Sequence, residues 1–507
     1  MKTKQKIEFG DFQTPLPLAR EVCTKLNELG VAPSVVVEPT CGVGNFLRAA
    51  AETFPSATLE GMDVNEEHLR TANNELNEFS VAGRLRMHLQ DFFAFDWDTY
   101  LNNWQGQLLI LGNPPWVTNS TVSGLEGSNL PEKQNFLRLR GFAAKTGKSN
   151  FDISEWMLIR LIQALRGRRA TLALLCKSMT ACKALRYAWQ NDGRIASASL
   201  YQISAKEHFD ASVDACLFVA QLGHPGPPEA SVYPNLRANT PERRIGLRGK
   251  DLVSDLTTYN RLRTLEGLSP YQWRSGLKHD CAAVMELEPL GGERYRNKQG
   301  QEVALEADYV YPLLKSTDLS KGRFVPSRLV LVTQRHTSED TSLIASSAPL
   351  TWSYLNSHQD AFQARKSSIY SGRSPFAVFG IGEYAFAPWK VAVSALHHQP
   401  RFVVVCPHQG KPVIFDDTCY YLAFAGQEEA EVVADILNSP ACRQFLTALI
   451  FPGTKRPLTV ELLQRLNIKA IAQEAGLGTR WNGARKKNYA APLEAPQLQF
   501  IMEQPSP

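Results

Sequence analysis

Residues 108–116, Leu-Leu-Ile-Leu-Gly-Asn-Pro-Pro-Trp, combine an apolar run with a rigid polar corner. The run predicts a buried strand, and Asn113 follows it where Pro114 and Pro115 restrict the backbone. This corner can offer two fixed carbonyl oxygens as acceptors, and Trp116 adds a flat apolar face. Together these groups suit a planar ring that bears an amino group, although a proline-rich turn after a buried strand has the same pattern.

Three further predicted strands, all upstream of this corner, lead to acidic residues. The four strands are followed by Glu38, Asp63, Asp91 and Asn113. Each residue alone could be a polar group that faces a loop, but four in succession are poorly explained in this way. We therefore interpret the four residues as one site. Glu38 disfavours phosphate and suits an amine-bearing ligand. Asp63 has the position of an acid that commonly holds the ribose hydroxyls of a nucleoside cofactor, and Asp91, beside Phe92, suits an adenine amino group.

The elements that must position these residues alternate between strand and helix. Residues 35–37 predict a strand, residues 39–44 carry a glycine turn, and residues 45–51 predict a helix. Strand, turn and helix in this order open a doubly wound α/β unit, in which ligands bind at the carboxyl ends of the strands. The predicted fold class is therefore α/β.

Five short motifs follow one another along the chain. They are Q-T-P at 13–15, E-P-T-C-G-V-G-N-F at 38–46, G-M-D-V-N at 61–65, Q-D-F-F at 90–93 and N-P-P-W at 113–116. This order resembles that of the S-adenosylmethionine-dependent amino-methyltransferases of DNA, and among them the gamma class of N6-adenine methyltransferases from restriction–modification systems. The resemblance extends over residues 9–222. Trp116 departs from the more usual Tyr or Phe, which should preserve stacking and slightly alter the pocket.

The resemblance implies a Rossmann-like class I methyltransferase domain followed by a mixed, β-rich target-recognition domain. It implies S-adenosyl-L-methionine as the cofactor, held by Thr14, Pro15, Glu38, Thr40, Gly42, Gly44, Asp63, Asp91, Phe92 and Asn113. The catalytic residues that it implies are Asn113, Pro114, Trp116 and, in the later segment E-H-F-D-A-S-V, Phe209. No metal is expected for this chemistry.

The implied reaction transfers a methyl group to the N6 amino group of adenine. The side-chain oxygen of Asn113 and the carbonyl of Pro114 would accept the two amine hydrogens, so that the nitrogen lone pair can point at the sulfonium methyl. Trp116 and Phe209 would stack on the base. A base inside a duplex cannot reach such a pocket, so base flipping is expected.

Composition changes along the chain predict the domain organisation. We expect a catalytic domain over 1–240, a DNA target-recognition domain over 241–427, and a C-terminal helical segment with a polar tail over 428–507. Residues 428–447 and 457–466 look helical, and the tail from Gly476 is expected to be poorly ordered.

The second region contains stretches that mix cations, hydroxyls and aromatics, as in residues 271–280 and 364–370. Such mixtures suit contacts with phosphates and bases. The residues expected to bind DNA are Arg274, Lys278, Arg365, Lys366, Lys455 and Arg456.

Charge and composition narrow the class of protein. The net charge is +5, but the charges are unevenly distributed along the chain. Residues 1–100 carry 9 Lys+Arg against 15 Asp+Glu, whereas residues 101–250 carry 19 Lys+Arg against 10 Asp+Glu. The excess after the Asn-Pro-Pro-Trp corner favours a polyanionic partner. No apolar run approaches a membrane span, no signal peptide is evident, and the nine cysteines include no C-x-x-C pair. We therefore expect a cytoplasmic protein that does not bind membranes.

The expected partners are double-stranded DNA and a cognate restriction endonuclease that acts on the same site. A single chain with its own recognition module can act as a monomer. A bifunctional enzyme that also cuts DNA is an alternative, although no [D/E]-x-K tripeptide of the commonest nuclease type occurs. N4-cytosine and RNA are alternative targets. A glutamine methyltransferase of proteins and a catalytically silent DNA-binding subunit fit the sequence less well.

Overall fold

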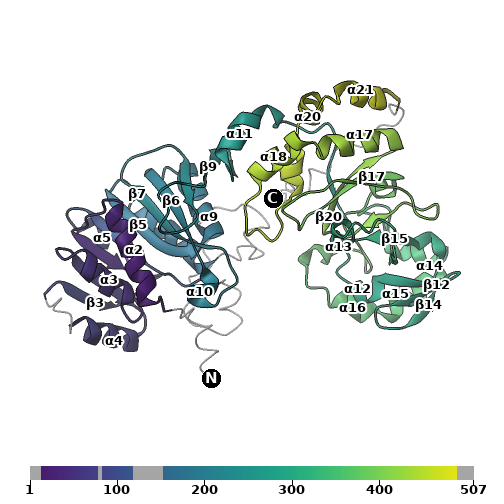
Figure 1. The fold of residues 1–507 in the computed structure, drawn as a ribbon. Coiled ribbons are helices and arrows are strands. Elements are labelled where there is room, and N and C mark those ends of the chain that lie inside the picture. Colours follow the sequence, from purple (N-terminus) through teal and green to yellow (C-terminus); the bar gives the residue numbers. More distant parts are fainter. Residues whose placement is uncertain (1–12, 78–82, 118–151, 488–507) are drawn as a thin grey trace, which may run out of the picture. The chain divides into compact units, whose positions relative to one another are not determined.

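The computed structural model describes residues 13–77, 83–117 and 152–487, and the description below is confined to these. The chain divides into two compact units. The first comprises residues up to Thr257 together with Phe451–Gly453, and the second comprises most of the remainder. Each unit is described by itself (Figure 1).

The first unit is built on a ten-stranded sheet. In sheet order its strands are β10 (Asp251–Val253), β9 (Arg243–Arg248), β8 (Glu229–Tyr233), β6 (Ile195–Ile203), β7 (Ala215–Leu222), β5 (Ala170–Lys177), β4 (Leu108–Gly112), β1 (Val35–Glu38), β2 (Thr58–Asp63) and β3 (Leu85–Leu89). Neighbours from β3 to β5 pair in parallel, and β7 runs antiparallel between β5 and β6. The strand order reverses direction at β1 and β4, where an open α/β sheet forms its ligand-binding crevice.

Helices cover this sheet. They are α2 (Leu16–Glu28), α3 (Asn45–Thr53), α4 (Glu66–Asn77), α5 (Trp97–Asn102), α8 (Ile153–Ala164), α9 (Ser178–Gln190) and α10 (Ala205–Phe209), and α11 (Leu256–Leu262) follows the last strand. The predicted Rossmann-like α/β architecture is confirmed.

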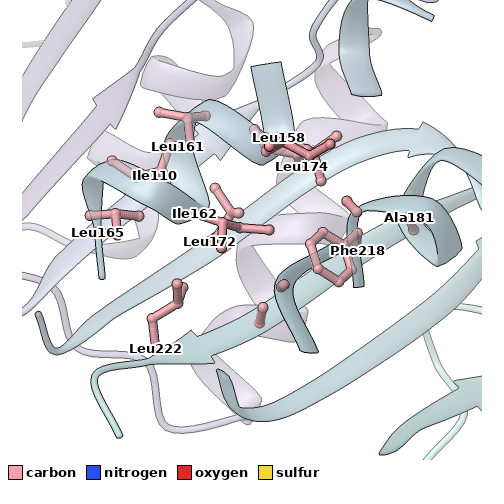
Figure 2. Packing of buried hydrophobic residues seen from close by; sticks show 14 of the residues in the cluster. Ile110, Leu158, Leu161, Ile162, Leu165, Leu172, Leu174, Ala181, Phe218 and Leu222 are labelled. Atoms are coloured by element: carbon pink, nitrogen blue, oxygen red, sulfur yellow. The ribbon is translucent and has the colours of Figure 1, made fainter. Parts of the chain in front are cut away.

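Strand β4 is apolar throughout because both of its faces are covered. Leu108 and Ile110 belong to the hydrophobic cluster that contains α8 and α9 side chains, part of which Figure 2 shows. Leu109 and Leu111 belong to the cluster that contains α2 and α3 side chains. Each such burial contributes roughly 1.5–3 kcal/mol, so the strand that carries the Asn-Pro-Pro-Trp corner is anchored from both sides.

The second unit is rich in β-structure, as predicted. One sheet has the order β11 (Arg274–Ser275), β20 (Cys419–Phe424), β17 (Trp389–Ser394) and β18 (Val403–Val405). The other has the order β14 (Glu302–Ala304), β13 (Arg294–Asn297), β12 (Glu286–Gly291), β16 (Arg328–Leu331), β15 (Val310–Leu314) and β19 (Ile414–Phe415).

Short helices accompany these two sheets. They are α12 (Ala282–Met285), α13 (Ser316–Ser320), α14 (Ile344–Ser347), α15 (Pro349–Ser357), α16 (Gln359–Gln363), α17 (Gln427–Leu437), α18 (Pro440–Leu449), α19 (Val460–Gln464), α20 (Ile468–Glu474) and α21 (Gly478–Lys487). In the described ranges, no helix has the length and apolar character needed to span a bilayer.

Several boundaries differ from those expected. The expected domain boundary at residue 240 falls between β8 and β9, which are neighbours in one sheet. The helix expected over 428–447 is divided, because Ser439 caps a new helix that starts at Pro440. The expectation of poor order from Gly476 onward is wrong for α21, since Trp481 is buried there and its indole donates to the Tyr271 hydroxyl at 2.8 Å.

Candidate active site

Polar side chains lie at the ends of four adjacent parallel strands of the first sheet, β1 to β4. Glu38 and Asp63 are the last residues of β1 and β2, Asp91 follows β3 by two residues, and Asn113 follows β4 directly. Because these strands are parallel and adjacent, all four residues lie at the same edge of the sheet. The predicted convergence of the strand ends is therefore present in the fold.

Glu38 is buried against the end of the neighbouring strand β4. Only 3% of its surface is exposed, and a Cβ placed on Gly112 would lie 3.3 Å from its Cγ. Burial, and then the negative charge of Asp63, raise the pKa of the Glu38 carboxyl. Among the described residues its Oε2 atom has no hydrogen-bond partner, and the same holds for Thr40 Oγ1. Enclosed polar atoms of this kind call for a polar ligand.

The glycine turn after β1 holds Asp63 in place. The Gly42 amide donates to Asp63 Oδ2 and the Asn65 amide donates to Asp63 Oδ1, each at 2.8 Å. Gly42 and Gly44 have φ values of +52° and +84°, which side-chain-bearing residues rarely adopt. A carboxylate oxygen can accept more than one hydrogen bond, so Asp63 retains capacity for ribose hydroxyls.

The Q-T-P segment lies across this turn. Gln13 Oε1 accepts from the Val43 amide at 3.1 Å, and the Asn45 side-chain amide donates to the Thr14 carbonyl at 2.9 Å. A Cβ on Gly42 would approach Gln13 Oε1 to 2.3 Å, so a side chain there would displace the segment. Thr14 is buried, and Pro15 immediately precedes α2. The fold thus brings a motif from the start of the chain to the first strand turn.

Asp91 and Phe92 occupy different environments. Asp91 is partly exposed, and its Oδ1 accepts from the Phe93 amide at 2.9 Å. Phe92 is 6% exposed, and its ring centroid lies 4.8 Å from that of Trp97 in the core. A ring this enclosed can present only an edge to a cofactor.

The Asn-Pro-Pro-Trp corner is held by contacts with β5. Pro114 is buried, and the Trp116 indole donates to the Leu175 carbonyl at 3.3 Å. The rings of Trp116 and Phe209 meet edge to face, with their centroids 5.1 Å apart and an interplanar angle of 69°. The two predicted stacking residues are therefore brought together, but in this arrangement they contact each other and leave no space for a planar base between them.

Two charged residues at the corner were not expected from the sequence. Lys177, the last residue of β5, donates to the Trp116 carbonyl at 2.9 Å and to Asp152 Oδ2 at 2.5 Å. Asp152 also accepts from the Ser154 amide at the start of α8, and the Ile153 amide donates to the Val117 carbonyl. We call Lys177 and Asp152 the clasp. Lys177 ends an apolar strand just as the acidic residues do, and that position was its signal in the sequence.

The cations that were expected to bind DNA fall into two groups. Arg365 donates to the carbonyls of Phe362, His279, Ala377 and Pro375 through all three of its nitrogens. The half-buried Arg274 donates to the Gln272 side chain and lies 4.2 Å above the Tyr384 ring. Both arginines therefore brace the fold of the second unit.

The other four of these cations are more accessible. Lys366 and Lys455 are exposed, and Arg456 is exposed with Asp417 at 3.7 Å. Lys278 is partly exposed and pairs with Asp280 at 3.0 Å. These residues stay candidates for contact with a polyanion.

His279, between Lys278 and Asp280, has a structural environment. It is 7% exposed, its Nδ1 accepts from the Cys281 amide at 3.1 Å, and burial lowers the pKa of its imidazole to about 4. Over the described part of the chain, no group of three or more His, Cys, Asp or Glu residues is arranged to hold a metal ion.

Comparison with known proteins identifies relatives over nearly the whole chain. No family model matches. The chain is 40% identical over 474 residues to the Type II methyltransferase M.NspV of Nostoc sp. (strain ATCC 29411 / PCC 7524), which covers 93% of this chain and 98% of that relative. It is 27% identical over 175 residues to the Type II methyltransferase M.XamI of Xanthomonas campestris pv. amaranthicola, which covers 31% of this chain and 32% of that relative.

Among solved structures, the fold is similar to that of the Type IIL restriction-modification enzyme MmeI in complex with DNA. The TM-score is 0.51 at 13% identity, and the match covers 96% of this chain and 80% of MmeI. The fold is thus that of a class I methyltransferase joined to a β-rich C-terminal part.

Proposed function

Since this chain belongs to the Type II methyltransferases of restriction–modification systems, whose methyl donor is S-adenosylmethionine, we propose that it methylates the N6 amino group of adenine at a specific site in duplex DNA. The observation that carries the proposal is the contact between the ends of β1 and β4. Gly112 lies against the buried Glu38, which supports a shared site in which Glu38 binds the cationic cofactor and the neighbouring Asn113 and Pro114 accept from the amine.

The residues present fit this cofactor. Glu38 and Thr40 have enclosed oxygen atoms suited to its amino acid part, Asp63 to its ribose hydroxyls, and Asp91 to its adenine amino group. The glycines at 42 and 44 let the backbone approach closely. When bound, the cofactor supplies an electrophilic methyl group on a sulfonium sulfur.

The chain's contribution to the reaction is alignment and hydrogen bonding. The Asn113 side-chain oxygen and the Pro114 carbonyl accept the two hydrogens of the adenine amine, which draws the nitrogen towards a tetrahedral state. With the cofactor bound, these two acceptors would hold the nitrogen lone pair towards the methyl group, which would exchange its bond to sulfur for one to nitrogen, and the amine would release one proton to water. Acceptors that strengthen their bonds as positive charge develops on nitrogen lower the barrier.

Recognition of the base requires it to leave the duplex. Trp116 offers one face for stacking, and Phe209 becomes the second face when its ring moves off Trp116. The second unit supplies site recognition in this proposal. The modified site would then be protected from a cognate restriction endonuclease, and the methyltransferase would act as a monomer.

Single-molecule sequencing of host DNA, with and without expression of the protein, tests this proposal. We expect N6-methyladenine at one sequence motif only when the protein is present, and none with the Asn113→Ala variant. N4-methylcytosine at a motif would reassign the target base, and cleaved DNA would favour the bifunctional alternative. Methylated RNA with unmodified DNA would reject DNA as the substrate.

A further inference from the structure

The second unit contains a surface hollow of about 840 Å³ that the proposed reaction does not use. It is lined by α13, by the connection from β17 to β18, and by α18. These three segments are distant in the sequence, so the hollow exists only in the folded unit. It includes none of the residues that were expected to bind DNA.

The lining is cationic and rich in hydrogen-bond donors. Arg401 and Arg443 contribute guanidinium groups, His397 and His398 contribute imidazoles, and Thr447 contributes a hydroxyl. All five residues are exposed, and the lining contains no Asp or Glu. Arginine, hydroxyl and amide groups are the usual donors to nucleic acid phosphates.

Neither Arg401 nor Arg443 forms an ion pair with any residue that the structure describes. Arg401 lies 6.0 Å above the Phe324 ring, which positions the guanidinium without neutralising it. Two other accessible arginines of this unit differ, since the partly exposed Arg296 pairs with Glu302 and the exposed Arg480 pairs with Asp435. The positive charge at the hollow is therefore uncompensated.

The composition of the surrounding segments explains why no carboxylate pairs with the cations of the hollow. Residues 384–415 and residues 436–460 contain no Asp or Glu, and the two stretches supply the β17–β18 connection and α18. They also contact each other at Ala395, next to the lining residue Ser394, because the Leu458 amide donates to the Ala395 carbonyl at 3.4 Å.

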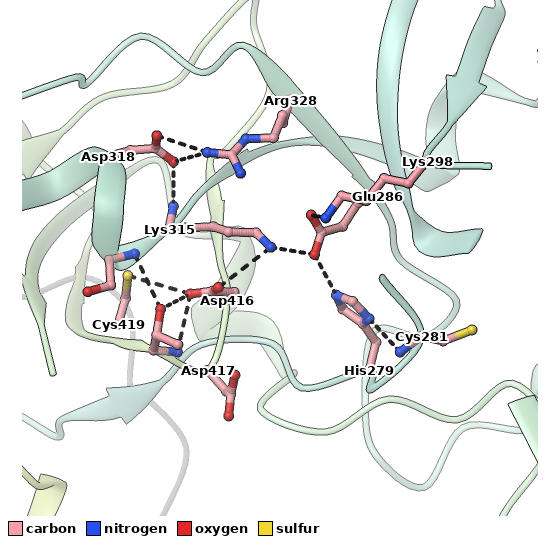
Figure 3. A network of polar contacts seen from close by, with 12 residues as sticks. His279, Cys281, Glu286, Lys298, Lys315, Asp318, Arg328, Asp416, Asp417 and Cys419 are labelled. Carbon is pink, nitrogen blue, oxygen red and sulfur yellow. Dashed lines mark hydrogen bonds and ion pairs between the residues drawn. The ribbon is translucent and has the colours of Figure 1, made fainter. Parts of the chain in front are cut away.

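The carboxylate nearest in sequence to the hollow is already neutralised. Asp318 lies on α13, beside the lining residues Leu319 and Ser320, but both of its oxygens accept from Arg328 at 2.8 and 2.9 Å. Figure 3 shows this pair, together with Lys298 and Lys315 directed at Glu286 in the same network. In this network the cations are matched by carboxylates, whereas in the hollow they are not.

We propose that this hollow binds the phosphodiester backbone of duplex DNA, with Arg401 and Arg443 each contacting a phosphate. The proposal rests on the proposed function for the identity of the polyanion. Contacts of this kind contribute affinity and orientation equally on all sequences, and each one adds a released counterion to the salt dependence of binding.

Fluorescence anisotropy of the full chain with a labelled duplex of mixed sequence, over a series of salt concentrations, tests the proposal. For the double variant Arg401→Gln/Arg443→Gln, the slope of log K against log salt should become shallower by about 2, since each phosphate contact contributes about 0.9. Affinity at low salt should fall by at least about tenfold. Circular dichroism and cofactor binding should match the wild type.

The matched control is the double variant Arg296→Gln/Arg480→Gln, which removes the same charge from two accessible, paired arginines of the same unit. It should keep the wild-type slope. An equal loss in this control would show a general charge effect and overturn the assignment. A wild-type slope and affinity in the Arg401→Gln/Arg443→Gln variant would also overturn it.

Two further arms separate the sources of failure. The first arm measures the binding of inorganic phosphate by isothermal titration. If phosphate binding is lost in the Arg401→Gln/Arg443→Gln variant while its affinity for the duplex is unchanged, the hollow is a small-anion site and the DNA contact is rejected. The second arm, sequencing of DNA from a host that expresses the wild type, tests the proposed function independently. If the host DNA is methylated and the variant binds the duplex as the wild type does, only the DNA contact at the hollow is rejected. If the host DNA is unmodified and the wild type does not bind the duplex, both proposals are rejected.

Discussion

Asn113 owes its position to the residue before it. Gly112 ends β4 with φ of +154° and lies against Glu38, so no side chain separates the acceptor groups of the corner from the buried carboxyl. In the proposed function the two neighbouring residues have separate tasks. Asn113 would act on the amine that receives the methyl group, and Glu38 would act on the molecule that donates it.

Replacement of Asn113 by Ala should abolish methyl transfer and leave cofactor binding largely intact. The variant loses an acceptor whose bond strengthens as charge develops on nitrogen, and one such group is worth about 10²–10³ in kcat. Tritium transfer from labelled S-adenosylmethionine to DNA measures the rate, and calorimetry measures the affinity. An equal loss of cofactor affinity would contradict the role assigned to Asn113.

The opposite result is expected for Glu38→Gln. The amide keeps the shape of the carboxyl but not its charge, so the affinity for S-adenosylmethionine should fall by roughly tenfold to a hundredfold, as for a charged hydrogen bond. Because burial raises the pKa of Glu38, wild-type affinity should increase as pH rises and the carboxyl ionises. Calorimetry across pH measures both effects. A variant with unchanged affinity and an unchanged pH profile would refute the assignment.

At the scale of elements, the end of β5 supports the end of β4. The clasp joins the Trp116 carbonyl to Asp152 through one ammonium group, and Asp152 at the same time caps α8. The Asp152 side chain is 8% exposed, so removal of Lys177 would leave a nearly buried charge without its partner. The corner is therefore held by the ends of two further elements, β5 and α8.

Lys177→Met should lower both stability and kcat while the affinity for the cofactor is retained. Leaving buried polar groups unpaired costs about 1–3 kcal/mol, and the Trp116 carbonyl loses its donor. Urea unfolding and methylation rates measure the two effects, and Lys177→Arg should restore part of the rate. Lys183→Met is the control for kcat, because it also leaves a nearly buried carboxylate, Glu155 with 7% of its side chain exposed, without its partner, but this ion pair does not include Trp116; it should lower stability and keep the wild-type kcat. Wild-type kcat in Lys177→Met would show that the clasp is only structural.

The packing of the secondary-structure elements also determines which cations are accessible to a ligand. In the sequence, residues 364–370 form one basic, hydroxyl-rich stretch, and nothing distinguishes its two cations. In the structure, Arg365 donates to backbone carbonyls while its neighbour Lys366 is exposed. Composition predicts a basic surface but does not identify which of two adjacent cations braces the backbone. That distinction depends on the path of residues 375–377, which Arg365 contacts.

At the scale of the whole molecule, each unit has its own buried core and its own charge pattern. The first has the excess of cations after the corner, and the second has the two acid-free stretches around the hollow. The second unit also buries an isolated lysine. Lys390 on β17 is 1% exposed, and its ammonium donates to the Ala387 carbonyl at 2.7 Å.

Burial lowers the pKa of Lys390 to about 7, from 10.5 for an ordinary lysine. Between these values the folded chain binds fewer protons than the unfolded chain, so the free energy of unfolding rises with pH across this window. Below pH 7 the folded protein carries the full cost of the buried charge. Lys390→Met should therefore raise stability most below pH 7, by on the order of 5 kcal/mol, with the gain vanishing towards pH 10.5.

Thermal unfolding of the wild type and Lys390→Met at several pH values measures this gain. Lys469→Met, which changes an exposed lysine on α20, should show no such pH dependence. A difference between wild type and Lys390→Met that stays constant with pH would attribute the effect to packing rather than to ionisation.

The sequence by itself determined the parallel strands, the polar residues at their ends, the glycine turn and the β-rich second unit. These features follow from local patterns, since a strand buried on both faces must be apolar and a ligand-facing strand end must be polar. Tertiary structure alone decided that Trp116 contacts Phe209, that Lys177 holds the corner, and that Arg401 and Arg443 share one hollow. Each of these contacts joins segments far apart in the chain, and their distance is set by how the intervening elements pack, which no local pattern encodes.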